Sequence, residues 1–322
     1  MQPLPTKAGG HAISCWIHKK LSKHGHRSLL ASDTPPGSYN DGFLMLRASA
    51  RFLSHTLAIA GGGLLAMAVP LLNIAIPKSG YSLRRDLHYG DGPRARLDLY
   101  LPDALKAPAP VLLFFYGGSW QSGTKNIYRA FGEAFATAGV ITAVADYRLY
   151  PEVKYPAFVE DGASAFQYLR EKTAEHGGDP ARLFLCGHSA GAYIAAMLAC
   201  NPEFGVDHIR GVIGIAGPYD FLPLYDPALI DIFGGDRVMT TQPIKYARNK
   251  TPPMLLAHGT ADKTVGPGNS RRMATRLSEA GNDVTLIEYQ GRGHLDIVLS
   301  LAHGFRHLTT LREDMLRFIA AN

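Results

Sequence analysis

The sequence predicts an α/β protein with a mostly parallel central sheet that is flanked by helices. Three observations support this fold class. After position 80, short apolar runs alternate with stretches of helical periodicity, which is typical of β-α-β units. Several runs are apolar at every position, as strands buried on both faces must be. Polar residues gather at the carboxyl ends of the runs, the edge where open α/β sheets carry their chemistry.

The predicted elements follow one another in a regular order. The first strand, 95–102, alternates apolar and polar residues and is expected to be half-buried. The later strands are short apolar runs ended by Gly, Asp or His: 110–118, 140–147, 182–189, 211–217, 253–259 and 283–289. Helical patterns lie between them: 126–138, 157–175, 190–200, 268–280 and 305–320. Segment 218–250 is longer than a simple connection, so we expect a small cap over the sheet edge.

Charge is concentrated at one end of the chain. The 322 residues have a formal net charge of +6, and residues 1–51 carry seven Lys or Arg against two Asp. The remainder is almost neutral, with 26 basic and 25 acidic residues. Without a basic stripe on the body, the sequence argues against nucleic acid as a partner.

The N-terminal quarter contains an uncharged run, 52–77, about as long as a bilayer-spanning helix. A buried core helix is the alternative, but three consecutive glycines and Pro70 would weaken it. Arg47 and Arg51 precede the run as in a signal peptide. We therefore expect 1–51 to be disordered or not naturally translated, and 52–77 to be a membrane anchor or signal-like segment. The protein would then be membrane-anchored or exported, and otherwise cytoplasmic, with 78–322 as its catalytic domain.

Three cysteines, Cys15, Cys186 and Cys200, are too few and too irregularly spaced for a disulfide framework or a zinc site. No other motif indicates a metal or a cofactor, and we expect neither.

The stretch GHSAG, 187–191, places Ser189 between two glycines directly after an apolar strand and before the helical run AGAYIAAMLA. A serine at the tip of a sharp strand-to-helix turn takes a strained backbone conformation, and the residues two positions before and after it are crowded by the neighbouring chain. Glycine at 187 and 191 relieves that crowding. This context predicts a nucleophile elbow. A simple strand-to-helix turn is the alternative.

A serine nucleophile needs a base, and the base needs an acid that orients it. In this topology the acid and then the base should follow later strands. Asp262 follows the strand at 253–259, and His294 follows the strand at 283–289. Other candidates are less well placed: His258 lies in its strand, His188 is expected to point away across the elbow, and His303, His307, Asp236 and Asp296 lie elsewhere.

The stretch FFYGGSW supplies donors for the oxyanion that attack on a carbonyl creates. We expect the N–H groups of Gly117, Gly118 and Ala190 to form this hole. A plain glycine turn is the alternative.

Residues from about 80 to 320 resemble the α/β-hydrolase fold, within the esterase and lipase group that includes hormone-sensitive lipase, bacterial carboxylesterases, kynurenine formamidase and prenylcysteine methylesterase. The matching residues are YGGSW (116–120), DYRLYPE (146–152), YPAFVED (155–161), GGDPARLFLCGHSAG (177–191), Asp262 and His294. Tyr116 stands where the family often has His, and Ser119-Trp120 replaces a third glycine.

The sequence thus predicts a serine carboxylic ester hydrolase that acts through an acyl-enzyme on a small-molecule ester. An aryl formamidase that cleaves an activated amide is the nearest alternative, and a catalytically silent binding module is another. Trp120 and Tyr219 are expected to line the substrate pocket, with ordinary packing as the alternative. Membrane association would occur through 52–77.

Overall fold

The computed structural model describes residues 76–105 and 108–322. The predicted segment 1–51 and nearly all of 52–77 lie outside these ranges. In the described part of the chain, no helix combines the length and apolarity that crossing a bilayer requires.

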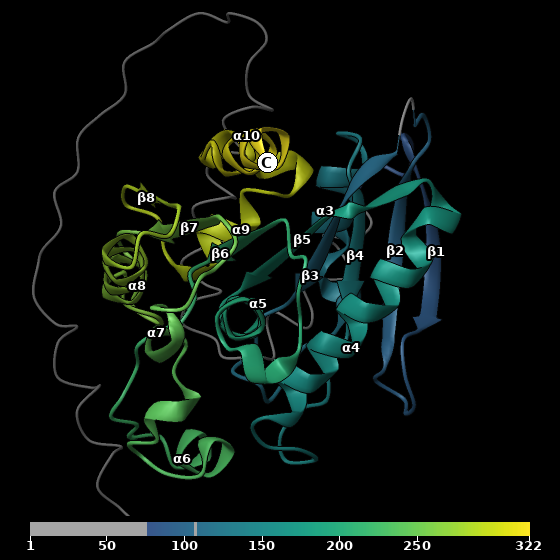
Figure 1. The fold of residues 1–322 in the computed structure, drawn as a ribbon. Coiled ribbons are helices and arrows are strands. Elements are labelled where there is room, and N and C mark those ends of the chain that lie inside the picture. The colour runs from purple at the N-terminus through teal and green to yellow at the C-terminus, as the bar shows by residue number, and fades with distance from the viewer. Residues whose placement is uncertain (1–75, 106–107) are drawn as a thin grey trace, which may run out of the picture. The chain divides into compact units, whose positions relative to one another are not determined.

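Within the described residues, eight strands form one sheet in the order β1-β2-β4-β3-β5-β6-β7-β8 (Figure 1). The pairs β1/β2 and β2/β4 are antiparallel, and all other neighbours are parallel. This confirms the predicted α/β class. The strands are β1 Tyr81–His88, β2 Arg96–Pro102, β3 Ala109–Phe115, β4 Ile141–Ala145, β5 Gly178–His188, β6 Gly211–Ile215, β7 Met254–Gly259 and β8 Val284–Tyr289.

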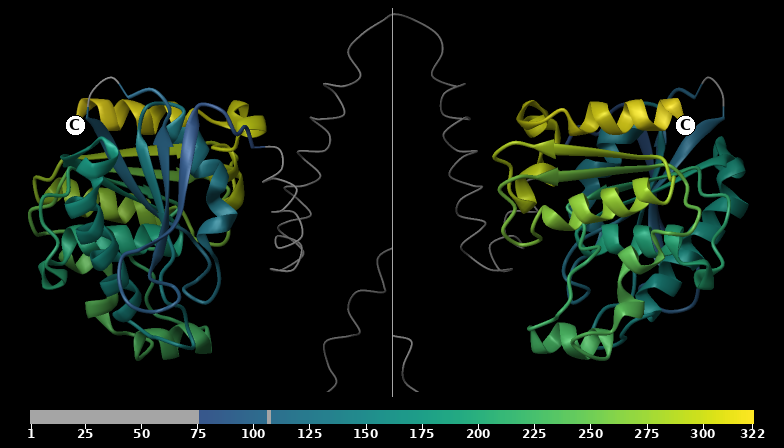
Figure 2. Two further views of the ribbon diagram at one scale, coloured as in Figure 1. Left: turned by 90° about the vertical axis from the view of Figure 1, so that its right-hand side faces the viewer. Right: turned by 60° about the vertical axis from the view of Figure 1, so that its left-hand side comes forward.

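Helices cover both faces of the sheet (Figures 1 and 2). Helices α3 and α10 lie on one face, and α4, α5 and α8 lie on the other. The α-helices are α3 Arg129–Ala136, α4 Ala157–Lys172, α5 Ala190–Cys200, α6 Pro227–Phe233, α7 Pro243–Tyr246, α8 Gly268–Glu279, α9 His294–Leu299 and α10 Leu311–Ala321. The 3-10 helices are η1 Lys125–Tyr128, η2 Thr173–His176, η3 Pro202–Phe204, η4 Met239–Thr241 and η5 His303–Leu308.

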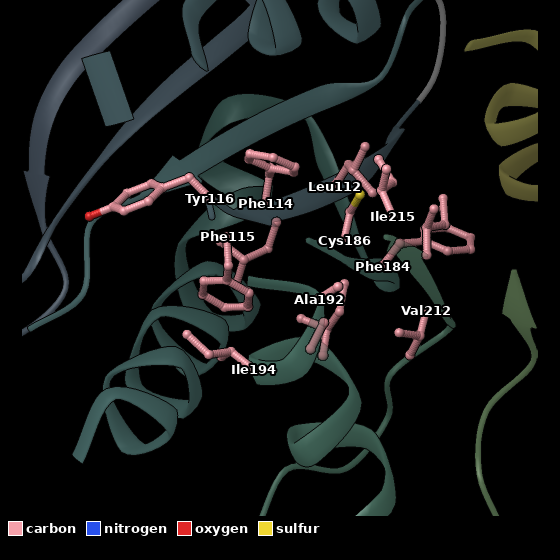
Figure 3. Packing of buried hydrophobic residues seen from close by; sticks show 14 of the residues in the cluster. Leu112, Phe114, Phe115, Tyr116, Phe184, Cys186, Ala192, Ile194, Val212 and Ile215 are labelled. Carbon is pink, nitrogen blue, oxygen red and sulfur yellow. The ribbon is translucent and has the colours of Figure 1, made fainter. Parts of the chain in front are cut away.

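The core forms where β3 and β5 lie side by side at the centre of the sheet. Both faces of β3 are buried, so Phe114 and Phe115 pack into opposite layers (Figure 3). Phe114 stacks on Phe131 of α3 at 3.8 Å between ring centroids. Phe115 lies on the side of Ile194 of α5 (Figure 3). This two-sided packing holds the carboxyl ends of the central strands in fixed positions.

Strand β1 was not predicted from the sequence. Its stretch YSLRRDLH has a run of exposed charged residues, and its pairing with β2 shifts register between Arg84 and Leu87. The charged run and the register shift interrupt the alternation of Tyr81, Leu83 and Leu87, so the hydrophobic pattern of this strand is weak.

Segment 218–250 contains α6, η4 and α7. It contacts the loop before α4, where Tyr155 N donates to the carbonyl of Ile232 at 3.0 Å and Lys154 pairs with Asp231 at 2.6 Å. These contacts join the segment to the loop that carries the DYRLYPE motif.

Candidate active site

Ser189 lies at the junction of β5 and α5 with φ 54° and ψ −121°, a left-handed backbone conformation that is costly for a residue with a Cβ. A Cβ on Gly187 would lie 2.2 Å from the backbone of Gly191. A Cβ on Gly191 would lie 1.9 Å from the carbonyl oxygen of Phe115. Both positions therefore require glycine, for the steric reason that the GHSAG pattern suggests.

Asp262 and His294 are brought together although 32 positions separate them. Asp262 follows β7, and His294 is the first residue of α9, after β8. Their closest atoms, His294 Nδ1 and Asp262 Oδ2, are 2.7 Å apart. Asp262 has no exposed side-chain surface, while 11% of the His294 side chain is exposed. The buried carboxylate therefore holds an imidazole that still reaches solvent.

Asp262 is held as a carboxylate by four donors. Its Oδ1 accepts from the backbone N–H groups of Thr264 and Val265, both at 2.9 Å. Its Oδ2 contacts His294 and also His258 Nε2, at 3.2 Å. Burial alone would raise the pKa of Asp262, but the hydrogen bonds from His258 and His294 outweigh it and hold the pKa below its ordinary value. The carboxyl group is therefore ionised at neutral pH.

His258, a rival base in the sequence, is fully buried. Its Nε2 lies 2.8 Å from the carbonyl oxygen of Val265, which can only accept, so Nε2 carries the proton. Its Nδ1 lies 2.7 Å from Ser270 Oγ and accepts from that hydroxyl. Both ring nitrogens are thus engaged, and His258 supports Asp262 from behind.

His188 connects the elbow to His294. Its ring lies 4.8 Å from the His294 ring between centroids, and its Nε2 is 3.1 Å from the His294 carbonyl oxygen. Among the described residues, no direct hydrogen bond joins Ser189 Oγ to His294, as is common before substrate tightens such contacts. The expectation that His188 points away across the elbow overlooked this contact.

The YGGSW turn packs directly on the elbow. A Cβ on Gly117 would lie 2.9 Å from Ser189 Cβ. Ser119 and Trp120 both have positive φ, at 53° and 59°, so the turn is strained at two successive residues that carry a Cβ. Among the described residues, the N–H groups of Gly118 and Ala190 have no acceptor. Gly117 differs from the prediction because its N–H donates to Tyr128 Oη, at 3.4 Å.

A hydrogen-bond network around Tyr116 lies behind the turn. Tyr116 Oη donates to Asp146 Oδ1 at 2.9 Å, and Tyr147 Oη donates to the Tyr116 carbonyl at 2.8 Å. Arg94 Nη2 contacts Tyr116 Oη and the Gly123 carbonyl. The DYR motif therefore holds the turn from behind.

The two predicted pocket residues lie in different surroundings. Trp120 is 3% exposed and belongs to an aromatic cluster with Phe158, Tyr193, Phe221 and Phe233. Its Nε1 has no hydrogen-bond partner in the described part of the chain.

Tyr219 is fully buried, and its hydroxyl occupies the space beside Gly214, where a Cβ would lie 2.0 Å from Oη. Its backbone N–H donates to Asn269 Oδ1 at 2.9 Å. Its Oη, like Trp120 Nε1, has no hydrogen-bond partner in the part of the chain that the structure describes.

The rival acids have other partners. Asp236 pairs with Arg237 at 3.5 Å and is largely exposed. Asp296 Oδ2 accepts from the Gly293 N–H at 3.0 Å and so holds the turn that precedes His294. The sequence reasoning missed Tyr128 and the roles of His188 and His258. For the two histidines, adjacency to Ser189 and spacing of four residues from Asp262 were available signals, whereas Tyr128 offered none.

A family model described as BD-FAE matches residues 97–277, more than half of the chain and the segment that holds the elbow, the YGGSW turn and Asp262. The chain belongs to the BD-FAE family. This BD-FAE protein has the α/β-hydrolase fold and falls in the esterase and lipase group.

Curated relatives of this BD-FAE protein are named as esterases. A probable isoprenylcysteine alpha-carbonyl methylesterase of Arabidopsis thaliana is 31% identical, over 67% of this chain and 52% of the relative. Esterase LipC of Mycobacterium tuberculosis is 29% identical, over 66% of this chain and 60% of the relative. The chain spans between 52% and 58% of the length of three similar methylesterases.

Solved structures are similar over most of the described chain. Esterase 2 of Thermogutta terrifontis, phosphoramylated by tabun, has a TM-score of 0.64 and 27% identity, and the match covers 76% of this chain and 96% of that one. The same esterase with bound butyrate has a TM-score of 0.62 and 25% identity, over 76% and 95% of the two chains.

Proposed function

We propose that this chain is a serine hydrolase of carboxylic esters that works through an acyl-enzyme. The observation that carries the proposal is the 2.7 Å contact between His294 Nδ1 and Asp262 Oδ2, at the sheet edge that also carries Ser189 in its strained turn. A base oriented by a buried carboxylate beside an elbow serine is the arrangement that activates a hydroxyl.

In the first half-reaction, Ser189 Oγ attacks the ester carbonyl carbon and its proton passes to His294 Nε2. His294 keeps its Nδ1 proton, which is donated to Asp262. When the tetrahedral intermediate collapses, the alcohol leaves with the proton from Nε2, and the acyl group remains on Ser189. In the second half-reaction, water attacks the acyl carbon and gives a proton to Nε2. When this intermediate collapses, Nε2 returns the proton to Ser189 Oγ and the carboxylic acid is released.

The oxyanion of each tetrahedral intermediate is assigned to the N–H groups of Gly118 and Ala190. Both lack an acceptor within the described residues, and preorganised amides of this kind supply a large part of catalysis. Gly117 takes part only when substrate draws its N–H away from Tyr128 Oη.

We assign Trp120 to the substrate pocket because it is the last residue of the YGGSW turn, which packs on Ser189, and because its buried Nε1 lacks a partner in the described chain. The similar Thermogutta esterase has been solved with butyrate and with propionate bound. These likenesses favour esters with short acyl groups as substrates.

Two other functions, formamide cleavage and binding without catalysis, have weaker support. A kynurenine formamidase of Salmo salar is 24% identical over 71% of this chain, a weaker likeness than that to the methylesterases, so formamide cleavage stands second. A catalytically silent binding module would have no need to retain the ionised, four-donor surroundings of Asp262.

The decisive test combines labelling with turnover. We expect a fluorophosphonate probe to label Ser189 alone, because among the serines of the described ranges this one lies in an elbow on the sheet edge that carries the oriented His294. We also expect hydrolysis of p-nitrophenyl propionate and butyrate to exceed that of long-chain esters and of N-formylkynurenine. Labelling located by mass spectrometry on another residue, or no labelling of folded protein, would instead favour the binding module.

The N-terminal run leads to a separate proposal, that 52–77 anchors the protein to a membrane. Its uncharged sequence supports this, and every motif of the proposed chemistry lies after Lys78. We expect the full chain to sediment with membranes and a chain that begins at Lys78 to stay in the supernatant with unchanged kcat/KM. If the shortened chain aggregates or loses activity, the run packs on the hydrolase as a core or lid helix.

A further inference from the structure

His188 lies between two segments that are distant in sequence. It is the last residue of β5, directly precedes Ser189, and is 2% exposed. One side of its ring faces His294, at 4.8 Å between centroids. On another side, Tyr128, the last residue of η1, places Oη 3.2 Å from His188 Nδ1. The ring therefore touches both the turn that carries the proposed base and the helix that follows the YGGSW turn.

The direction of each hydrogen bond follows from the chemistry of the partners. The His294 carbonyl can only accept, so His188 Nε2, at 3.1 Å, carries the ring proton and donates it. A neutral imidazole then has an accepting Nδ1, which receives the Tyr128 hydroxyl proton. The Tyr128 oxygen accepts in turn from the Gly117 N–H at 3.4 Å. Donor and acceptor match at every link of the chain Gly117, Tyr128, His188, His294.

We propose that His188 is a positioning residue for the hydrolase proposed above: it holds the His294 turn and the Gly117 turn at a set separation around Ser189. This inference rests on the proposed function. Asp262 fixes the tautomer and the rotation of the His294 ring, but it follows β7, and β6 lies between β7 and the elbow strand β5. His188 links the His294 turn to the elbow strand, because it is the last residue of β5 and directly precedes Ser189.

A positioning role beside the base requires that His188 stay neutral. Its burial, and next the neighbouring His294, lower the pKa of His188 to about 3. Its tautomer and hydrogen bonds therefore persist while His294 gains and loses a proton. No second positive charge appears beside the His294 imidazolium that forms in each half-reaction.

The test uses substitutions that remove hydrogen bonds of His188 or restore one of them. In His188→Phe the ring remains and both polar links are lost. We expect kcat for p-nitrophenyl butyrate to fall about 10- to 100-fold with little change in KM, because displacement of a catalytic group by about 1 Å costs this much. In His188→Gln the side-chain amide reaches the Nε2 position and can donate to the His294 carbonyl, so most of kcat should return. In His188→Asn the amide reaches only the Nδ1 position and cannot donate to the His294 carbonyl, so kcat should stay low.

Tyr128→Phe removes one hydroxyl and keeps the ring contacts with Phe114 and Tyr116. We expect about a tenfold loss of kcat, the scale of one hydrogen bond. When it is combined with His188→Phe, the losses should not add, because both residues belong to one chain. Tyr225→Phe, which removes a hydroxyl from a residue 84% exposed, serves as the matched control and should have no effect.

Thermal unfolding of each variant separates positioning from folding. Unchanged kcat in His188→Phe, equal losses in the Phe and Gln variants, or a loss that follows Tm alone would each overturn the inference. If His188→Phe does not fold, the test rests on Tyr128→Phe, and an unchanged kcat in that variant would overturn the inference. A wild-type protein without esterase activity or Ser189 labelling would contradict the proposed function. If the wild type is active and the His188 and Tyr128 variants are equally active, the proposed function stands and only the positioning role of His188 is wrong.

Discussion

Replacing Ser189 by Ala, His294 by Ala, or both residues together is expected to lower kcat for a p-nitrophenyl ester by similar factors, on the order of 10⁵ to 10⁶. Ser189 supplies the nucleophile and His294 the base, and neither accelerates the reaction without the other. Once one is absent, removal of the second therefore costs almost nothing more. The residual rate should still exceed the rate of uncatalysed hydrolysis in water, because the Gly118 and Ala190 amides remain in place.

The measurement is steady-state kinetics of the two single variants and the double variant, with circular dichroism to verify folding. His307→Ala, at an exposed site in η5, is a matched control for His294→Ala and should keep full activity. Losses that multiply in the double variant would mean that His294 and Ser189 act independently, and the proposed pairing would be wrong.

The second large effect is expected from Asp262→Asn, at about 10⁴-fold in kcat. The amide oxygen should take the Oδ1 position, because the N–H groups of Thr264 and Val265 both donate there. The NH₂ group then faces His294 Nδ1 as a donor. His294 must accept at Nδ1 and carry its proton on Nε2, a tautomer that cannot take the proton of Ser189.

This loss should come from the tautomer rather than from unfolding, and His258 helps to show why. Its Nε2–H also donates to the Val265 carbonyl, so it keeps a partner when Asp262 no longer accepts from it. Asp236→Asn, on an exposed carboxylate, is the matched control. An Asp262→Asn variant with near-normal kcat would show that another acid orients His294. Asp296, which caps the Gly293 N–H, would then be the first to examine.

The placement of the site followed from local sequence because the chemistry of an α/β sheet lies at strand ends. A few neighbouring residues define each part of the candidate site: the GHSAG turn, the strands that precede Asp262 and His294, and the glycines of YGGSW. Crowding at Gly187 comes from Gly191, within the elbow itself, whereas crowding at Gly191 comes from Phe115 on the neighbouring strand, so only the first is local in sequence. The helix 190–200 was predicted with the bounds that α5 has, because its apolar run is continuous and its start is set by the elbow.

Other elements could not be inferred from the sequence. Strand β1 carries three consecutive charged residues, Arg84 to Asp86, where its pairing with β2 shifts register, so its alternation is interrupted. Helix α9 is only six residues long, too short for a helical period to appear. The predicted helix 305–320 proved to be η5 followed by α10, which begins at Leu311.

By itself, then, the sequence determined the α/β class, the order of its central strands along the chain, and the positions where Ser189, Asp262 and His294 stand. Only the tertiary structure decided which groups touch. It placed His258 and His294 on one carboxylate, gave the Gly117 N–H to Tyr128, and put His188 between the two turns. The physical reason is range. Steric and periodic signals act between neighbours in sequence, whereas a hydrogen bond across 60 or 106 positions depends on how whole layers pack.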